Sequence, residues 1–181
     1  MKVQVRFLLW SFSRPLCEER KAEEKDRLLT KSQILIPCSE EGLSPERLYT
    51  EVDLTGDGLN EIIISDSVTM AGTGGIGWSL YRAAAPDQYY AKAFHFGSAI
   101  SCLAVEEDLN SKVSGKRLWI YWHISSQDGF IGYIFVNDKG VFELSSGLEI
   151  FPGTECGQKI ADAVFTPESC LEVKSLGKGE L

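Results

Sequence analysis

The sequence predicts a mainly β protein, built as an antiparallel meander, a β-sandwich or a partial propeller-like sheet, with a helical segment near its N-terminus. Three observations lead to this expectation. From residue 48 onward, runs rich in Ile, Val, Tyr, Phe and Trp alternate with turn residues. Residues 19–31 are dense in Glu, Lys and Arg and contain neither Gly nor Pro, as is typical of an exposed helix. A tight acidic glycine turn, residues 53–61, lies between two of the strand-like runs.

Length and composition are those of one globular domain. The chain has 181 residues, of which 44% are hydrophobic and 24% are charged. We assign residues 1–37 to an N-terminal strand and helical segment, and residues 38–181 to a single β-rich domain. The net charge of -8 argues against a nucleic-acid-binding protein, which would usually present a basic face. No stretch approaches the roughly 20 apolar residues of a transmembrane helix.

The N-terminus and the cysteines bear on the cellular compartment. Residues 1–17 have a basic start and a short apolar core, which is a weak secretory-signal pattern, but Arg14-Pro15 interrupts it. We expect an exported protein, periplasmic or extracellular, with a cytoplasmic one as the alternative. No CxxC pair occurs, so a zinc site is poorly supported. Both disulfides and buried free thiols are compatible with the five cysteines, Cys17, Cys38, Cys102, Cys156 and Cys170.

The strand-like runs follow one another along the chain after an expected loop at Pro37–Pro45. Leu48–Leu54 and Glu61–Ser67 should form a hairpin with the acidic turn at its tip. Further strands are expected at Trp78–Ala83, Gln88–Phe96, Ala99–Glu106, Lys116–Ser125, Phe130–Asp138 and Val141–Ser145. A later helix is expected at Gly157–Phe165, followed by a closing strand at Ser169–Ser175.

A faint internal repeat divides the β-rich part into two degenerate units, residues 48–106 and 107–152. Gly77 aligns with Gly132, and Gly58 aligns with Gly115. In the second unit, Lys112 and Leu118 stand where the first unit has Thr55 and Glu61, so only the first unit keeps its acidic turn. Repeats of this length are found as propeller blades.

The acidic turn reads DLTGDGLNE and carries oxygen donors at alternate positions around a glycine, as a hard cation such as Ca²⁺ requires. It resembles the calcium loop of FG-GAP-type repeats, found in integrin α-chain propellers and in many bacterial surface and secreted proteins. The resemblance implies a calcium ion held by the side chains of Asp53, Thr55, Asp57 and Glu61 and by the backbone carbonyl of Leu59.

Two residues depart from the family pattern. Thr55 replaces the usual Asn, Asp or Ser, and Glu61 replaces the usual Asp. An EF-hand is excluded because its bidentate Glu would fall on Ile64 and because β-branched residues follow the loop. The alternative to a metal site is an ion-free hairpin that uses Asp and Gly for ordinary turn chemistry. Three converging carboxylates without a cation would repel one another, which favours the metal.

Other motifs are less specific. Gly72–Gly77 is rich in glycine but lacks the ending of a phosphate-binding loop, and a strand follows it. A hydrolase with its site near this loop is the alternative function, and a pocket joining His123, Asp128 and a serine would favour it. His95 and His123 lie in aromatic runs and are expected to be packing residues. Core packing is also expected of the dense aromatic set Trp119, Tyr121, Trp122, Tyr133 and Phe135, although Trp122 or Trp78 could instead face a sugar or a protein.

The sequence therefore predicts a calcium-binding, non-enzymatic β-rich module in which structural Ca²⁺ stabilises a hairpin loop. We expect a protein partner, and an inhibitor or immunity-type role fits a small acidic domain.

Overall fold

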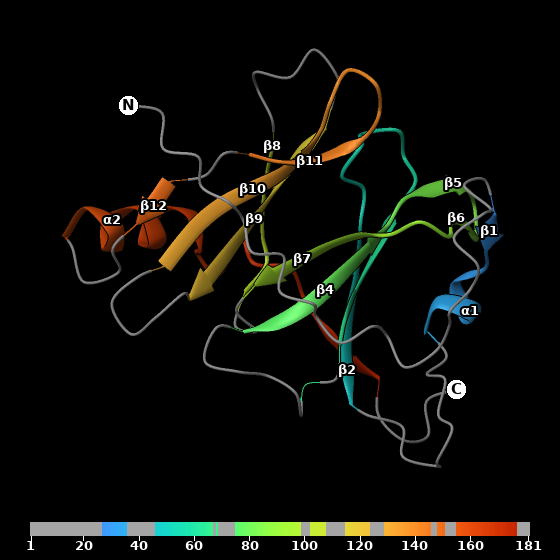
Figure 1. The fold of residues 1–181 in the computed structure, drawn as a ribbon, viewed down its shortest axis with the longest axis horizontal. Helices are drawn as coiled ribbons and strands as arrows, with labels where there is room; N and C mark the ends of the chain where they lie inside the picture. Colours follow the sequence, from blue (N-terminus) through green and yellow to red (C-terminus); the bar gives the residue numbers. More distant parts are fainter. Residues whose placement is uncertain are drawn as a thin grey trace, which may run out of the picture.

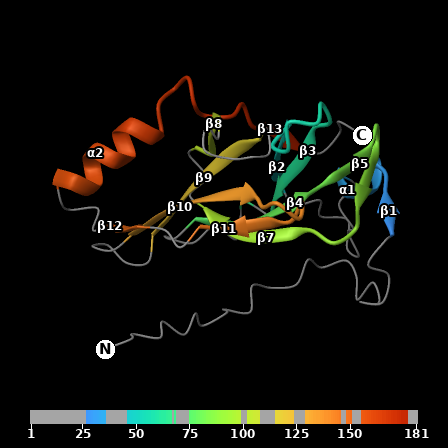
Figure 2. The same ribbon diagram turned by 90° about the horizontal axis from the view of Figure 1, so that it is seen from above.

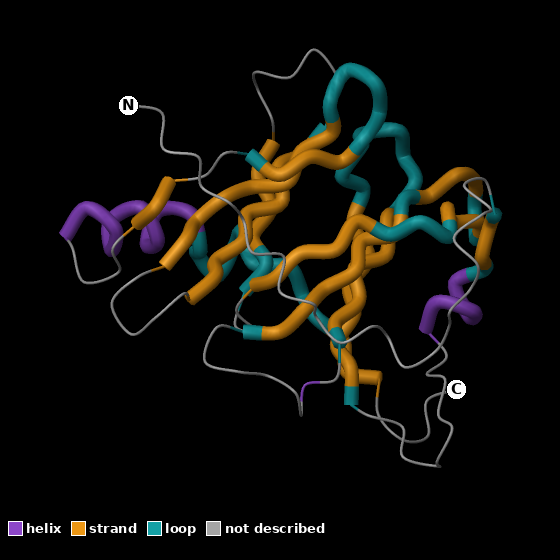
Figure 3. The backbone as a smooth tube through the Cα atoms, in the orientation of Figure 1, coloured by secondary structure: helices purple, strands orange, loops and turns teal. Residues whose placement is uncertain are grey.

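The structure is a computed structural model of the chain, and it describes residues 27–35, 46–66, 68, 75–98, 102–107, 115–123, 129–145, 148–150 and 155–176. The predicted N-terminal strand and signal region, the loop at 37–45, and Gly72–Gly74 lie outside the described residues. The described chain is mainly strand, in antiparallel sheets, with two short helices (Figure 3), which confirms the predicted fold class.

Two larger sheets carry most of the strands (Figure 1). The first has the order β13-β2-β3-β4-β7 and consists of Lys174–Leu176, Arg47–Val52, Glu61–Ser65, Ile76–Tyr81 and Phe94–Ser98. The second has the order β11-β10-β9-β8 and consists of Phe142–Leu144, Gly129–Val136, Lys116–His123 and Ala104–Glu107. In the second sheet β12, Leu148–Ile150, also pairs with β10.

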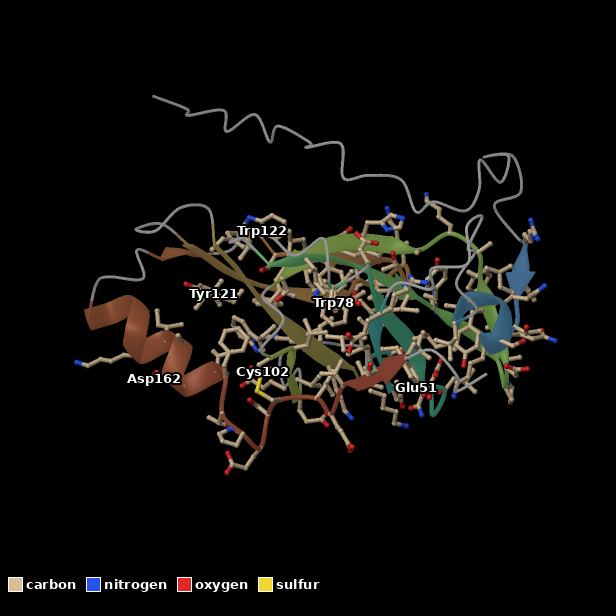
Figure 4. All side chains as sticks on the ribbon, turned by 90° about the horizontal axis from the view of Figure 1, so that it is seen from below. Glu51, Trp78, Cys102, Tyr121, Trp122 and Asp162 are labelled. Carbon is tan, nitrogen blue, oxygen red and sulfur yellow. A yellow bond between two sulfur atoms is a disulfide. The ribbon has the colours of Figure 1, made fainter. Side chains whose placement is uncertain are left out.

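One core joins the two large sheets. Alternate residues of each strand point to the same face, and the inner faces meet in a single cluster of buried side chains. The first sheet contributes Ile63, Ile76, Trp78, Leu80 and Phe96, and the second contributes Leu118, Ile120, Ile134, Val136 and Phe142. Trp78 lies at the centre of this core and is 1% exposed (Figure 4), so the alternative in which Trp78 faces a sugar or a protein is wrong.

A smaller layer covers the other face of the first sheet. Here β1 (Leu28–Leu29), β6 (Gln88–Tyr90) and β5 (Ala83–Ala85) form a three-stranded sheet in that order, and helix α1 (Lys31–Leu35) follows β1. The buried residues Leu29, Ile34, Leu35 and Tyr89 pack against Ile62 and Ile64 of β3. Lys31 Nζ also lies 2.6 Å from Glu51 Oε1, an ion pair between this layer and β2 (Figure 4).

The N-terminal helix differs from the prediction. Of the expected helix at 19–31, the described part begins at Arg27, and Leu28–Leu29 forms a strand instead. Leu28 and Leu29 pair with Tyr90 and Tyr89 of β6, and the buried Leu29 side chain joins the apolar cluster. Tertiary burial therefore overrides the local helical composition at Leu28 and Leu29, and the described helix α1 begins at Lys31.

Most predicted strands are present with shifted ends. The hairpin of β2 and β3 pairs Val52 with Glu61 and Tyr49 with Ile64, as expected. The predicted strand 88–96 is wrong as one strand, because it divides into β6 and β7 in different sheets with a bend at 91–92 between them. As a result β4 pairs on one side with β3 and on the other with β7, rather than with β5, the next strand in sequence.

The C-terminal segment ties the two sheets together. Helix α2 (Glu155–Val164), at the end of the molecule opposite α1 (Figure 2), confirms the predicted later helix. The chain then runs beside β8, where Val105 N–H donates to the Ser169 carbonyl and Leu171 N–H donates to the Leu103 carbonyl. It ends as β13 against β2, so the predicted closing strand begins later than expected. A disulfide between Cys102 and Cys170 fixes this segment to the second sheet (Figure 4).

The residues aligned in the suggested repeat occupy corresponding places in the two sheets. Gly58 lies between β2 and β3, and Gly115 lies directly before β9, the second strand of the other meander. Gly77 lies in β4, and Gly132 lies in β10, the third strand of its meander. Among the described helices, none is long and apolar enough to cross a membrane.

Candidate metal centre

The acidic turn forms the tip of the β2–β3 hairpin. β2 ends at Val52 and β3 begins at Glu61, so the loop between them carries all the predicted ligands except Glu61. Gly56 and Gly58 have φ angles of 75° and 85°. These left-handed conformations are open to glycine without strain, and they bend the backbone tightly enough to return it into β3.

Asp53 organises the tip through its carboxylate. Its Oδ1 accepts the N–H of Gly56 at 2.7 Å, and its Oδ2 accepts the N–H of Gly58 at 2.9 Å. The Thr55 hydroxyl lies 3.5 Å from Asp53 Oδ1, and Thr55 itself is buried. Asp57 is exposed and closes a smaller turn, because its Oδ1 accepts the N–H of Leu59 at 2.9 Å.

Glu61 points from the start of β3 into the protein. It lies on the same strand face as Ile63, which belongs to the common core, and it is 0% exposed. Its Oε2 accepts the N–H of Leu54 at 2.7 Å, while its Oε1 is buried and has no hydrogen-bond partner among the described residues. A buried carboxylate oxygen without a partner is costly in a folded protein.

Burial raises the pKa of Glu61 to about 7, and the negative charges of Asp57 and Asp53 raise it further, against the lowering effects of the Leu54 and Ala83 backbone N–H groups. The Ala83 N–H lies close enough to lower this pKa, but Oε1 makes no contact with the geometry of a hydrogen bond. The rise in the pKa of Glu61 therefore comes mainly from burial, with a smaller contribution from the repulsion that Asp57 and Asp53 exert on Glu61. At neutral pH this carboxyl is only partly ionised, and a cation placed near its free oxygen would favour the ionised form.

The second sheet contacts the base of the loop. Lys116 at the start of β9 donates its backbone N–H to the Leu54 carbonyl at 2.9 Å. Gly115 lies so close that a Cβ there would stand 3.0 Å from the same carbonyl oxygen. Sequence reasoning did not predict this contact, although its alignment of Gly115 with Gly58 had singled out the glycine.

The five predicted ligands lie at one hairpin tip, four in the loop and Glu61 at the start of β3, but their acidic side chains are not gathered around one point. Among the described residues, no three His, Cys, Asp or Glu side chains lie close enough together to hold a metal ion. Asp53 and Thr55 are adjacent and Glu61 presents an unpaired oxygen, whereas Asp57 faces solvent. The donor set is all oxygen, which fits Ca²⁺, and the orphaned Glu61 oxygen is the observation that fits a cation here.

Most of the features proposed for a hydrolase lie outside the residues that the structure describes. Asp128 lies outside them, and of His123 only the backbone position in β9 is described. A different polar pair lies near Gly77, because Ser79 of β4 is opposite His95 of β7 and its hydroxyl is 3.0 Å from His95 Nδ1.

Asp66 completes the polar group around this pair. Burial raises the pKa of Asp66, and nearby Arg47 and His95 lower it. Strand β4 is interior to its sheet, so the ladders with β3 and β7 occupy the backbone N–H groups around Ser79. Backbone N–H groups that are already bonded within these ladders are not free to stabilise an oxyanion. The His95 imidazole is the hydrogen-bond partner of the buried Ser79 hydroxyl.

Comparison of the chain with models of known protein families, with curated proteins and with solved structures found no match.

Proposed function

We propose that the protein is a calcium-binding, non-enzymatic β-rich binding module in which Ca²⁺ stabilises the loop 53–61. The single observation that carries the proposal is Glu61, a fully buried carboxyl with one unpaired oxygen at the base of an acidic loop. The resemblance of the loop to FG-GAP-type calcium loops agrees with it.

The ion would be held by oxygen atoms of Asp53, Thr55, Asp57 and Glu61 and by the Leu59 carbonyl. Its chemical contribution is positive charge, which offsets the repulsion that Asp53 and Asp57 exert on Glu61. Asp57 is the exposed member of the set and its side chain bonds only within its own turn, so it is the ligand with most freedom to move toward an ion. The ion thus acts on structure, through the hairpin tip, with no role in catalysis.

We propose that the protein is exported to the periplasm or the extracellular space. Its proposed partner is another protein. The Cys102–Cys170 disulfide supports export, because such bonds persist in oxidising compartments. An inhibitor or immunity-type role fits a small, acidic, non-enzymatic domain.

The test is the melting temperature of the purified chain in a chelator and in excess CaCl2 at pH 7.5. Ca²⁺ should raise it, and Asp57→Ala should abolish the response. Asp138→Ala is the matched control, since Asp138 is also an exposed turn aspartate but lies in the β10–β11 hairpin, and it should keep the response. Identical melts of the wild type with and without Ca²⁺ would sink the proposal.

A further inference from the structure

The outer face of the second sheet carries three aromatic side chains, Trp119 of β9 and Tyr133 and Phe135 of β10, which we call the aromatic shelf. Leu118, Ile120, Ile134 and Val136 on the same strands point into the common core, so the shelf residues face away from it. All three are partly exposed. The prediction that this aromatic set forms core is therefore wrong for these residues, which lie on the opposite side of the sheet.

The shelf is ordered by its own contacts. Trp119 and Tyr133 pack edge to face with ring centroids 4.9 Å apart, and Tyr133 and Phe135 lie 5.9 Å apart. The Arg117 guanidinium lies 4.7 Å from the Tyr133 ring centroid. Beyond the shelf, Phe165 at the end of α2 packs on Tyr121, so the helix end covers the neighbouring part of the same face. Binding to side chains that are already ordered costs little conformational entropy.

Residue types and ring geometry favour a protein over a glycan as the occupant. Trp, Tyr and Arg at the centre of a partly exposed patch are the residues that dominate protein–protein binding energy. A sugar would need an accessible ring face, but the rings are inclined by 61° and 57°, and Arg117 covers one face of Tyr133.

Two carboxylates flank the shelf and one cation, the Arg117 guanidinium stacked on Tyr133, lies within it, so the excess charge of this surface is negative and favours a basic partner. Glu106 of β8 and Glu143 of β11 flank it on either side, and both are exposed. Glu106 accepts a hydrogen bond from Trp119 Nε1 at 3.0 Å and Glu143 accepts one from Asn137 at 2.6 Å, and each bond uses only one carboxylate oxygen. A second copy of this chain, with its net charge of -8, would be repelled.

We infer that the aromatic shelf and its two flanking carboxylates bind a protein partner that presents apolar side chains between lysines or arginines. The inference rests on the proposed function as a protein-binding module, and it gives that partner a surface and a charge. It does not invoke Ca²⁺, because no shelf residue and neither flanking carboxylate belongs to the loop 53–61.

The experiment measures binding of a short synthetic peptide of alternating leucine and lysine by fluorescence anisotropy. The wild-type chain should bind it, and should bind an alternating leucine–glutamate peptide and a lysine-only peptide of equal length at least about tenfold more weakly. Trp119→Ala and Glu143→Lys should each weaken binding of the leucine–lysine peptide about tenfold. Tyr90→Ala is the matched control, since Tyr90 is an exposed aromatic residue of the small sheet, and it should bind as wild type.

The inference is overturned if Trp119→Ala and Glu143→Lys both bind the leucine–lysine peptide with wild-type affinity. It is also overturned if the wild type binds the lysine-only peptide as tightly as the leucine–lysine peptide. Self-association of the chain in sedimentation that Trp119→Ala removes would overturn it as well. Near-ultraviolet circular dichroism identifies a variant that fails to fold. If Trp119→Ala unfolds, peptide binding by Glu143→Lys, which changes only an exposed charge, still tests the inference. If the wild-type chain binds the leucine–lysine peptide but its melting temperature does not respond to Ca²⁺, the metal proposal fails and the binding inference stands.

Discussion

The backbone N–H of Lys116 donates to the carbonyl of Leu54 at 2.9 Å, and Leu54 in turn donates its own N–H to Glu61 Oε2 at 2.7 Å. Leu54 thus connects the start of β9 in the second sheet with the buried carboxyl of the candidate metal loop. The loop is a surface hairpin tip in the first sheet, yet its base is held from the other half of the molecule.

Gly115→Ala should destabilise the chain by about 1 kcal/mol and weaken Ca²⁺ binding. The new Cβ would stand 3.0 Å from the Leu54 carbonyl oxygen, which belongs to the backbone and has little room to yield. Denaturant unfolding and a calcium titration measure the two effects. A variant with wild-type stability and affinity would show that the contact at Leu54 does not position the loop.

The metal-free chain should lose stability as the pH rises from about 4.5 to 7. The pKa of Glu61 is raised from 4.5 to about 7 in the folded state, so the folded chain binds this proton more tightly than the unfolded chain. The resulting stability is present below pH 4.5 and lost as the pH rises through 7, by at most about 3 kcal/mol. Urea unfolding in a chelator across this range measures the slope, and a flat profile contradicts the assignment.

Glu61→Gln should raise the melting temperature in a chelator at pH 7.5 and remove the response to Ca²⁺. Glutamine can still accept the Leu54 N–H, and it carries no charge to be destabilised by burial and by the nearby Asp57 and Asp53. A residue that only supports the fold would lower the melting temperature when replaced. A higher melting temperature in the chelator together with loss of the Ca²⁺ response therefore identifies Glu61 as a metal ligand. A variant less stable than wild type in the chelator would argue that the charged form of Glu61 is already well accommodated.

Breaking the Cys102–Cys170 disulfide should cost up to about 4 kcal/mol, because the bond closes a chain loop with a sequence separation of 68 residues. Cys102→Ala with Cys170→Ala, unfolded in denaturant beside the wild type, measures this. The wild type in a reducing agent should approach the double variant. Mass spectrometry of the unreduced protein should find this pair linked, and free thiols at both positions would refute the bond.

Strand positions could be predicted because alternation and turn residues are local properties of the sequence. The hairpin around the acidic turn is the clearest case, since Gly56 and Gly58 determine the bend and the isoleucines after Glu61 determine the strand. What local pattern could not supply was the order of the strands. β4 skips β5 and β6 to pair with β7, and β13 returns to β2, because those pairings depend on contacts distant in sequence.

The burial of Glu61 and the exposure of the aromatic shelf could not be predicted for the same reason. A glutamate at the start of a strand is usually solvated, and it is buried here because its face of β3 is the one that meets the second sheet. Trp119 and Tyr133 belong to strands that are apolar on both faces, so composition does not identify the face that the core takes. The disulfide, too, joins cysteines that no spacing rule connects.

Calorimetric titration of the chelated chain with CaCl2 at pH 7.5 tests the central claim most directly. The account predicts one saturable site in the wild type, with release of a fraction of a proton because binding favours the ionised form of Glu61, and no binding heat in Glu61→Gln. The absence of saturable heat in the wild type, or an unchanged site in Glu61→Gln, would contradict the claim that loop 53–61 is a calcium site.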